Sequence, residues 1–179
     1  MTEKRLKKWW LLLLKGLILI VFSLIIFFYP DHPIQSIAIY FGICLIITGI
    51  TLILISTELR KFMDNWTMRL AEGLIDVVFG FFLLAHPEVD DYVIPILIGF
   101  WVIFYGVIIL AGSFGFEKTS VAKRKITLIV GLITILLGFV ISFNPDVPQL
   151  TNAVLIGIPI FIIGLANLFF ASNLKSLKE

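Results

Sequence analysis

Three ionisable side chains lie close together in an otherwise apolar stretch of the chain, RLAEGLIDVVFGFFLLAHP, which runs from Arg69 to Pro87. Arg69, Glu72 and Asp76 are spaced i, i+3 and i+7, so they share one face of a helix. A charged side chain at the centre of a bilayer costs roughly 2.5 to 3.5 kcal/mol on insertion scales, so both carboxyl groups need partners, protons or water. The chemistry that this face supports is therefore ion pairing or the passage of protons or ions.

The composition of the chain is that of an integral membrane protein. Of its 179 residues, 60% are hydrophobic and only 15% are charged, and its mean hydropathy is +1.08; soluble domains carry about 25% charged residues. A bilayer core of about 30 Å needs about 20 apolar residues per helix. Six segments meet this length: 9–29, 34–56, 66–86, 92–114, 125–144 and 150–171. The predicted fold class is all-α, a polytopic membrane protein with six transmembrane helices.

Internal repetition organises these six segments into three helical hairpins. Five marker residues recur, first after 57 residues and then after a further 58. The markers are Gly16, Ser23, Pro30, Gly42 and Gly49; then Gly73, Gly80, Pro87, Gly99 and Gly106; then Gly131, Gly138, Pro145, Gly157 and Gly164. The interpretation is a single transmembrane domain, residues 1–179, of three tandem parallel repeats at about 9–57, 66–115 and 124–172.

Small residues seven apart return to the same face of a helix. In lipid, such a face lets two backbones approach closely, so packing replaces the missing hydrophobic driving force. We therefore expect each helix to press its stripe of small residues against a neighbouring helix.

The repeat alignment places Lys15 at the same position as Glu72, and it places Asp76 at the same position as Thr134. If the hairpins pack around a pseudo-three-fold axis, Lys15 meets Glu72, and we predict an interhelical ion pair between them. The alternative is that Lys15 and Arg69 both extend to the headgroups at the nearer membrane surface. The candidate polar cluster in the membrane is Lys15, Arg69, Glu72, Asp76 and Thr134.

Asp76 has two interpretations. In the structural one, its carboxyl group is protonated and hydrogen-bonded to Thr134 or to a backbone carbonyl; in the other, it belongs to a proton or ion pathway. Four further polar side chains are expected to hydrogen-bond between helices: Thr48, Thr51, Asn152 and Asn167.

The Lys and Arg residues outside the helices gather at alternate ends of the segments. They lie before the first segment, between the second and third, between the fourth and fifth, and after the sixth. The positive-inside rule therefore predicts cytoplasmic N- and C-termini. The expected partner is the lipid bilayer, together with a second copy of the chain or another membrane protein. Nucleic acid is excluded because there is no basic, aromatic groove.

The repeated hairpin resembles the HdeD-type acid-resistance membrane proteins. The resemblance is carried by the glycines seven apart, by Asn144-Pro145 at an outer turn, and by the stretch Val154-Leu155-Ile156-Gly157 that leads to Ile163-Gly164. It covers the chain from about residue 15 to 171. The resemblance implies a multi-pass protein of the bacterial plasma membrane with a link to survival in acid, and it brings no catalytic residues.

No catalytic residues, cofactor or metal are expected, because the sequence has no His-Glu-x-x-His run, no Gly-rich phosphate loop and no histidine after residue 86. The expectation is a non-enzymatic membrane protein of acid or envelope stress. The alternative is a small proton, ion or solute transporter or channel that uses Glu72 and Asp76. His32 and His86 lie beside acidic residues at predicted outer turns, where a histidine is able to sense external pH.

Overall fold

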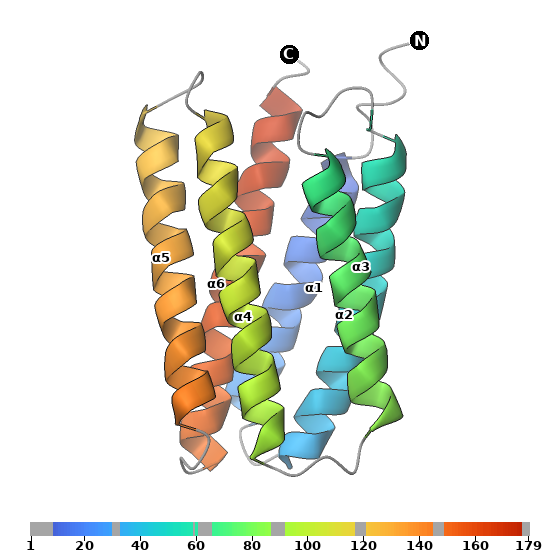
Figure 1. Ribbon diagram of the computed structural model, residues 1–179, viewed down its shortest axis with the longest axis vertical. Helices are drawn as coiled ribbons and strands as arrows, with labels where there is room; N and C mark the ends of the chain where they lie inside the picture. The colour runs from blue at the N-terminus through green and yellow to red at the C-terminus, as the bar shows by residue number, and fades with distance from the viewer. Residues whose placement is uncertain are drawn as a thin grey trace.

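The computed structural model describes residues 9–29, 33–58, 60, 66–86, 92–116, 121–144 and 149–176. Six α-helices run up and down in one bundle (Figure 1): α1 (Trp9–Phe28), α2 (Ile34–Glu58), α3 (Trp66–Ala85), α4 (Val93–Gly112), α5 (Val121–Phe143) and α6 (Gln149–Ser176). A short 3-10 helix, η2 (Ser113–Phe116), follows α4. The described part of the chain contains no strand, so the predicted all-α class is confirmed.

Five of the six helices are long and apolar enough to cross a membrane. The remaining helix, α3, has the same 20-residue length as α1 and α4 but carries Arg69, Glu72 and Asp76. It lies alongside the others in the bundle (Figure 1). The outward surface is apolar, as a lipid-facing surface must be: Val78 and Phe81 are 68% and 67% exposed. The protein is therefore a multi-pass membrane protein.

Three helices are longer than predicted, and α2 is so by only two residues, since it ends at Glu58. α5 begins at Val121 rather than at Lys125, because Ala122, Lys123 and Arg124 are good helix formers that extend the helix beyond its apolar part. α6 continues to Ser176 rather than ending at Ala171. The prolines that mark the repeats, Pro30, Pro87 and Pro145, fall outside the described residues.

The stripes of small residues lie against neighbouring helices, as predicted, and the structure arranges them in three equivalent seams. Gly49 and Gly42 of α2 face Gly73 and Gly80 of α3, and a Cβ atom on Gly49 would stand 2.7 Å from the carbonyl oxygen of Gly73. The α4–α5 seam repeats this arrangement, because a Cβ atom on Gly99 would stand 2.8 Å from the carbonyl oxygen of Gly138. The helix backbones are in direct contact at these glycines, so the packing depends on glycine having no side chain.

The third seam joins the last helix to the first. A Cβ atom on Gly16 of α1 would stand 2.8 Å from the carbonyl oxygen of Gly164 of α6, and the Ser23 hydroxyl donates a 2.9 Å hydrogen bond to the carbonyl oxygen of Gly157. Each seam therefore links an even-numbered helix of one repeat to an odd-numbered helix of another. The bundle closes on itself, with an apolar core that includes Phe22, Phe41 and Ile98.

Candidate functional site

The ammonium group of Lys15 lies between two carboxylates in the interior of the bundle. Its Nζ atom is 2.9 Å from Glu72 Oε1 and 2.9 Å from Asp76 Oδ2, and all three side chains are at most 1% exposed. Lys15 comes from α1 and both acids come from α3, so the predicted Lys15–Glu72 pair is present and also includes Asp76. The alternative, in which Lys15 extends to the headgroups, is wrong.

Arg69 completes a cluster of two cations and two anions, which we call the charged cluster: Lys15, Arg69, Glu72 and Asp76. Its Nη1 atom is 3.3 Å from Glu72 Oε2, and its guanidinium group lies over the ring of Phe170 of α6, 5.1 Å from the ring centroid. Arg69 is 17% exposed, so its side chain reaches from the buried carboxylate toward the surface. The formal charges of the cluster balance.

Two aromatic side chains of α4 donate hydrogen bonds to the charged cluster. Trp101 Nε1 donates to Asp76 Oδ1 at 3.0 Å, and the Tyr105 hydroxyl donates to Glu72 Oε1. The Lys15 ammonium group also lies over the Tyr105 ring, 5.0 Å from its centroid. With these donors, all four carboxylate oxygens of Glu72 and Asp76 accept at least one hydrogen bond. Neither aromatic side chain was predicted, because in an apolar segment a Trp or Tyr looks like core or interface packing.

Asn167 of α6 links the third repeat to this network. Its Nδ2 atom donates to the Tyr105 hydroxyl at 3.2 Å and to the carbonyl oxygen of Ile163 at 2.9 Å, which fits the interhelical role predicted for it. Its Oδ1 atom is buried and has no hydrogen-bond partner among the described residues. Buried acceptors in proteins are normally satisfied, so this oxygen is an exception within the network.

Thr134 does not join the cluster, although the sequence predicted that it would. Its hydroxyl donates to the carbonyl oxygen of Val130, one turn back in its own helix, at 2.8 Å. Thr48 and Thr51 likewise donate within α2, to Cys44 and Ile47, so their predicted interhelical bonds are wrong. A threonine hydroxyl reaches its own helix without any help from a neighbour. The side chain of Asn152 lies outside the described residues.

The two histidines are not part of this site. His86 is exposed directly after α3, beyond the end of that helix that lies farther from Glu72, and its ring lies 5.0 Å from that of Phe82. His32 lies outside the described residues. In the described part of the chain, no group of three His, Cys, Asp or Glu side chains is placed to hold a metal ion.

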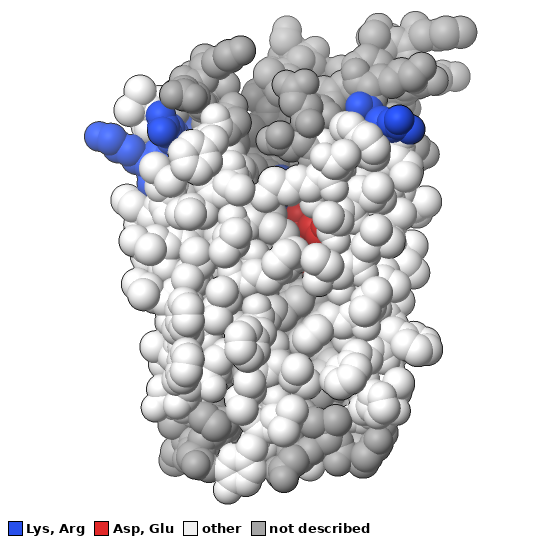
Figure 2. Space-filling view, in the orientation of Figure 1, with Lys and Arg blue, Asp and Glu red and all other residues white. Residues whose placement is uncertain are grey.

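The charged cluster lies nearer one end of the bundle. Lys15 is the seventh residue of α1, which places it about 9 Å along the helix from Trp9 at 1.5 Å per residue. On the face drawn in Figure 2, acidic atoms come into view in a recess below the end that carries Lys and Arg side chains. Two cavities, of about 740 and 440 Å³, are lined by apolar and tyrosine side chains and by Cys44 rather than by this cluster.

The comparisons with known proteins identify the repeat. The model of the short repeat of unknown function (DUF308) matches three times, at residues 14–85, 71–143 and 129–179. These matches begin 57 and 58 residues apart, which are the offsets of the glycine pattern. No curated protein and no solved structure matches the chain. Because the three matches together cover the chain from residue 14 to its end, the protein belongs to the DUF308 short-repeat family, the family of the HdeD-like membrane proteins.

Proposed function

We propose that this protein is a non-enzymatic component of the bacterial plasma membrane that acts in acid or envelope stress resistance. It works by packing within the membrane or against a partner membrane protein, with both termini in the cytoplasm. The family supports this proposal because it is that of the HdeD-like proteins. The distribution of Lys and Arg, which gather at one end of the face drawn in Figure 2, supports the orientation.

The observation that carries the proposal is that every charged group of the charged cluster has hydrogen-bond and ion-pair partners within the protein. Glu72 accepts from Lys15, Arg69 and Tyr105, and Asp76 accepts from Lys15 and Trp101. Every charge has a partner inside the protein, so the cluster holds α1, α3 and α4 together without needing a substrate. A buried network with satisfied partners favours a structural role, because removal of any member leaves an uncompensated charge or donor.

Survival in acid tests this function. Cells lacking the protein should survive acid exposure less well than wild-type cells, and the wild-type chain should restore survival. A Lys15→Met chain that is present at the wild-type level in the membrane should restore less. Equal survival with and without the protein would contradict the acid part of the proposal, and the same comparison under agents that damage the envelope would then test the remainder.

The histidines are tested in the same cells. If His32 and His86 sense external acid, a chain with both replaced by Gln should fail to restore acid survival. Unchanged survival would assign the acid response, where there is one, to other residues.

A small proton or ion transporter is the second candidate, and one observation favours it. The buried Asn167 Oδ1 atom has no hydrogen-bond partner in the part of the chain that the structure describes, and it lies beside Tyr105, which is hydrogen-bonded to Glu72. A water molecule on this oxygen would lengthen the hydrogen-bonded chain that runs from Glu72 through Tyr105 to Asn167 of α6.

Proton flux in vesicles decides between the two candidates. Purified protein is reconstituted into vesicles with a pH gradient, and the internal pH is followed by a trapped dye. The structural proposal expects flux equal to that of empty vesicles. Transport would instead give flux above that background, and Asp76→Asn would abolish it while the protein remains folded. Thr51→Val is the matched control, because Thr51 bonds only within α2 in the described structure.

A further inference from the structure

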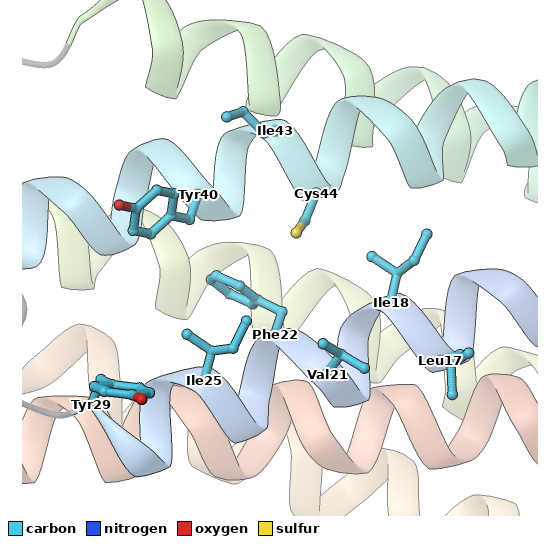
Figure 3. A pocket seen from close by; sticks show the side chains of 9 residues that line it. All are labelled: Leu17, Ile18, Val21, Phe22, Ile25, Tyr29, Tyr40, Ile43 and Cys44. Carbon is cyan, nitrogen blue, oxygen red and sulfur yellow. The ribbon is translucent and has the colours of Figure 1, made fainter.

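The two helices of one repeat are held apart along part of their length, and this leaves a groove on the membrane-facing surface. α1 is joined by its seam to α6 and α2 by its seam to α3. The opening between them, the α1–α2 groove, has a volume of about 740 Å³ (Figure 3). It is lined by residues of α1 from Leu17 to Ile25, by Tyr29 directly after α1, and by Tyr40, Ile43 and Cys44 of α2. The groove therefore follows from the way the repeats are joined.

The second cavity is the same groove in the next repeat. It has a volume of about 440 Å³ and is lined by Leu74, Ile75, Val78, Phe79, Phe82 and Leu97. Each of these residues stands 57 positions after a residue that lines the α1–α2 groove. The α1–α2 groove is the larger of the two, and at Cys44 it has a small side chain where the second repeat has Trp101. A groove that recurs at equivalent positions is a property of the repeat.

The length of the α1–α2 groove matches one leaflet of a bilayer. Leu17 and Tyr29 are 12 residues apart, which is about 18 Å along α1, whereas half of a bilayer core is about 15 Å. A transmembrane helix from another protein would need a groove about 30 Å long. One acyl chain needs only the depth of its own leaflet, so the groove is suited to an acyl chain rather than to a helix.

The two ends of the α1–α2 groove differ in the way that a lipid requires. Tyr29 and Tyr40 lie toward one end, and Leu17 lies at the other (Figure 3). Tyrosine places an apolar ring in the membrane and a hydroxyl group at its polar boundary. The tyrosine end is the one farther from Lys15, so the occupant enters from the leaflet opposite the charged cluster.

We propose that the α1–α2 groove binds one acyl chain of a phospholipid, whose headgroup lies beside Tyr29 and Tyr40. The chain fills the space between the two helices of the first repeat, with Val21 along its path and Cys44 beside it. This site goes beyond the stress function proposed above and does not involve the charged cluster.

Photo-crosslinking in vesicles tests the site. The protein is reconstituted into phospholipid that contains a small fraction with a diazirine on one acyl chain, then irradiated and digested, and the adducts are located by mass spectrometry. We expect more adducts on the groove residues of α1 and α2 than around Val107 of α4, which is as exposed as Val21 at 48%. Val21→Trp should lower the groove adducts about tenfold, equivalent to about 1.4 kcal/mol, and Val107→Trp should leave them unchanged.

Two outcomes would overturn the proposal. Equal adduct density at the groove and around Val107, or no effect of Val21→Trp, would mean that lipid only coats the surface. Efficient linkage of two copies through Cys44, the sole cysteine, by a short thiol crosslinker would mean that a second copy covers the groove. If Val21→Trp does not fold, Ile43→Phe replaces it, because the second repeat carries Phe100 at that position.

Discussion

Replacing Lys15 by Met tests the charged cluster most directly. The change keeps the length of the side chain but leaves Glu72 and Asp76, both fully buried, with one remaining ion pair among the described residues, that of Glu72 with Arg69. Removing one member of a buried ion pair typically costs about 3 to 5 kcal/mol, because the remaining charge is left uncompensated. Here the lost ammonium group contacts two carboxylates at 2.9 Å, so we expect a loss of about that size in the free energy of unfolding.

Unfolding in mixed micelles, in which increasing dodecyl sulfate is followed by far-ultraviolet circular dichroism, measures this loss. Lys125→Met is the matched control, because Lys125 is exposed near the start of α5 and should change stability by at most about 0.5 kcal/mol. The double variant Lys15→Met with Glu72→Gln restores the charge balance between Arg69 and Asp76. It should therefore lose less than the sum of the two single variants, by about 0.5 to 3 kcal/mol.

Two results would refute this reasoning. A Lys15→Met protein as stable as the Lys125→Met control would show that the Lys15 ammonium group does not hold the bundle together. Additive losses in the double variant would show that Lys15 and Glu72 act independently.

Two further predictions concern the seams and the donors to the charged cluster. Gly49→Ala should destabilise the bundle by about 1 to 3 kcal/mol, because its Cβ atom would stand 2.7 Å from the Gly73 carbonyl oxygen. Gly112→Ala should not, since the nearest atom to its Cβ would be 3.7 Å away. Thermal unfolding in detergent compares the two variants, and equal melting temperatures would contradict the close packing at the α2–α3 seam. Trp101→Phe removes the donor to Asp76 and should cost about 1 to 3 kcal/mol in the same unfolding assay; a loss below about 0.5 kcal/mol would mean that this bond contributes little.

The sequence was sufficient to predict the fold, because the physics of lipid leaves few choices. Apolar runs of about 20 residues must be helices in a bilayer, and glycines that recur at a fixed offset identify the repeated unit. The repeat alignment also predicted the Lys15–Glu72 pair, since equivalent positions in a closed bundle lie at similar depth. It did not show which helices form the seams. The spacing of the glycines identifies the packing face of each helix, but not which neighbouring helix packs against it.

The donors around the carboxylates were not predictable in the same way. Trp101 and Tyr105 occupy the repeat positions of Cys44 and Thr48, so comparison between the repeats offers no polar counterpart for the indole group. Thr134 stands at the position of Asp76, yet its hydroxyl group bonds to its own helix. The direction of a side chain depends on how its helix is rotated about the helix axis. The sequence pattern does not determine that rotation accurately enough to predict an individual hydrogen bond.

The seam between α1 and α6 has a consequence for how the protein is made. Of the six helices, α1 is made before the others but packs against α6, so the face around Gly16 stays open to lipid until α6 has been made. During that interval Lys15 can pair with Glu72 and Asp76 once α3 has been inserted, but the bundle is still open because the α1–α6 seam is absent. A chain truncated before α6 would therefore insert into the membrane with the small-residue face of α1 uncovered. Such a chain would be a target for quality-control proteases.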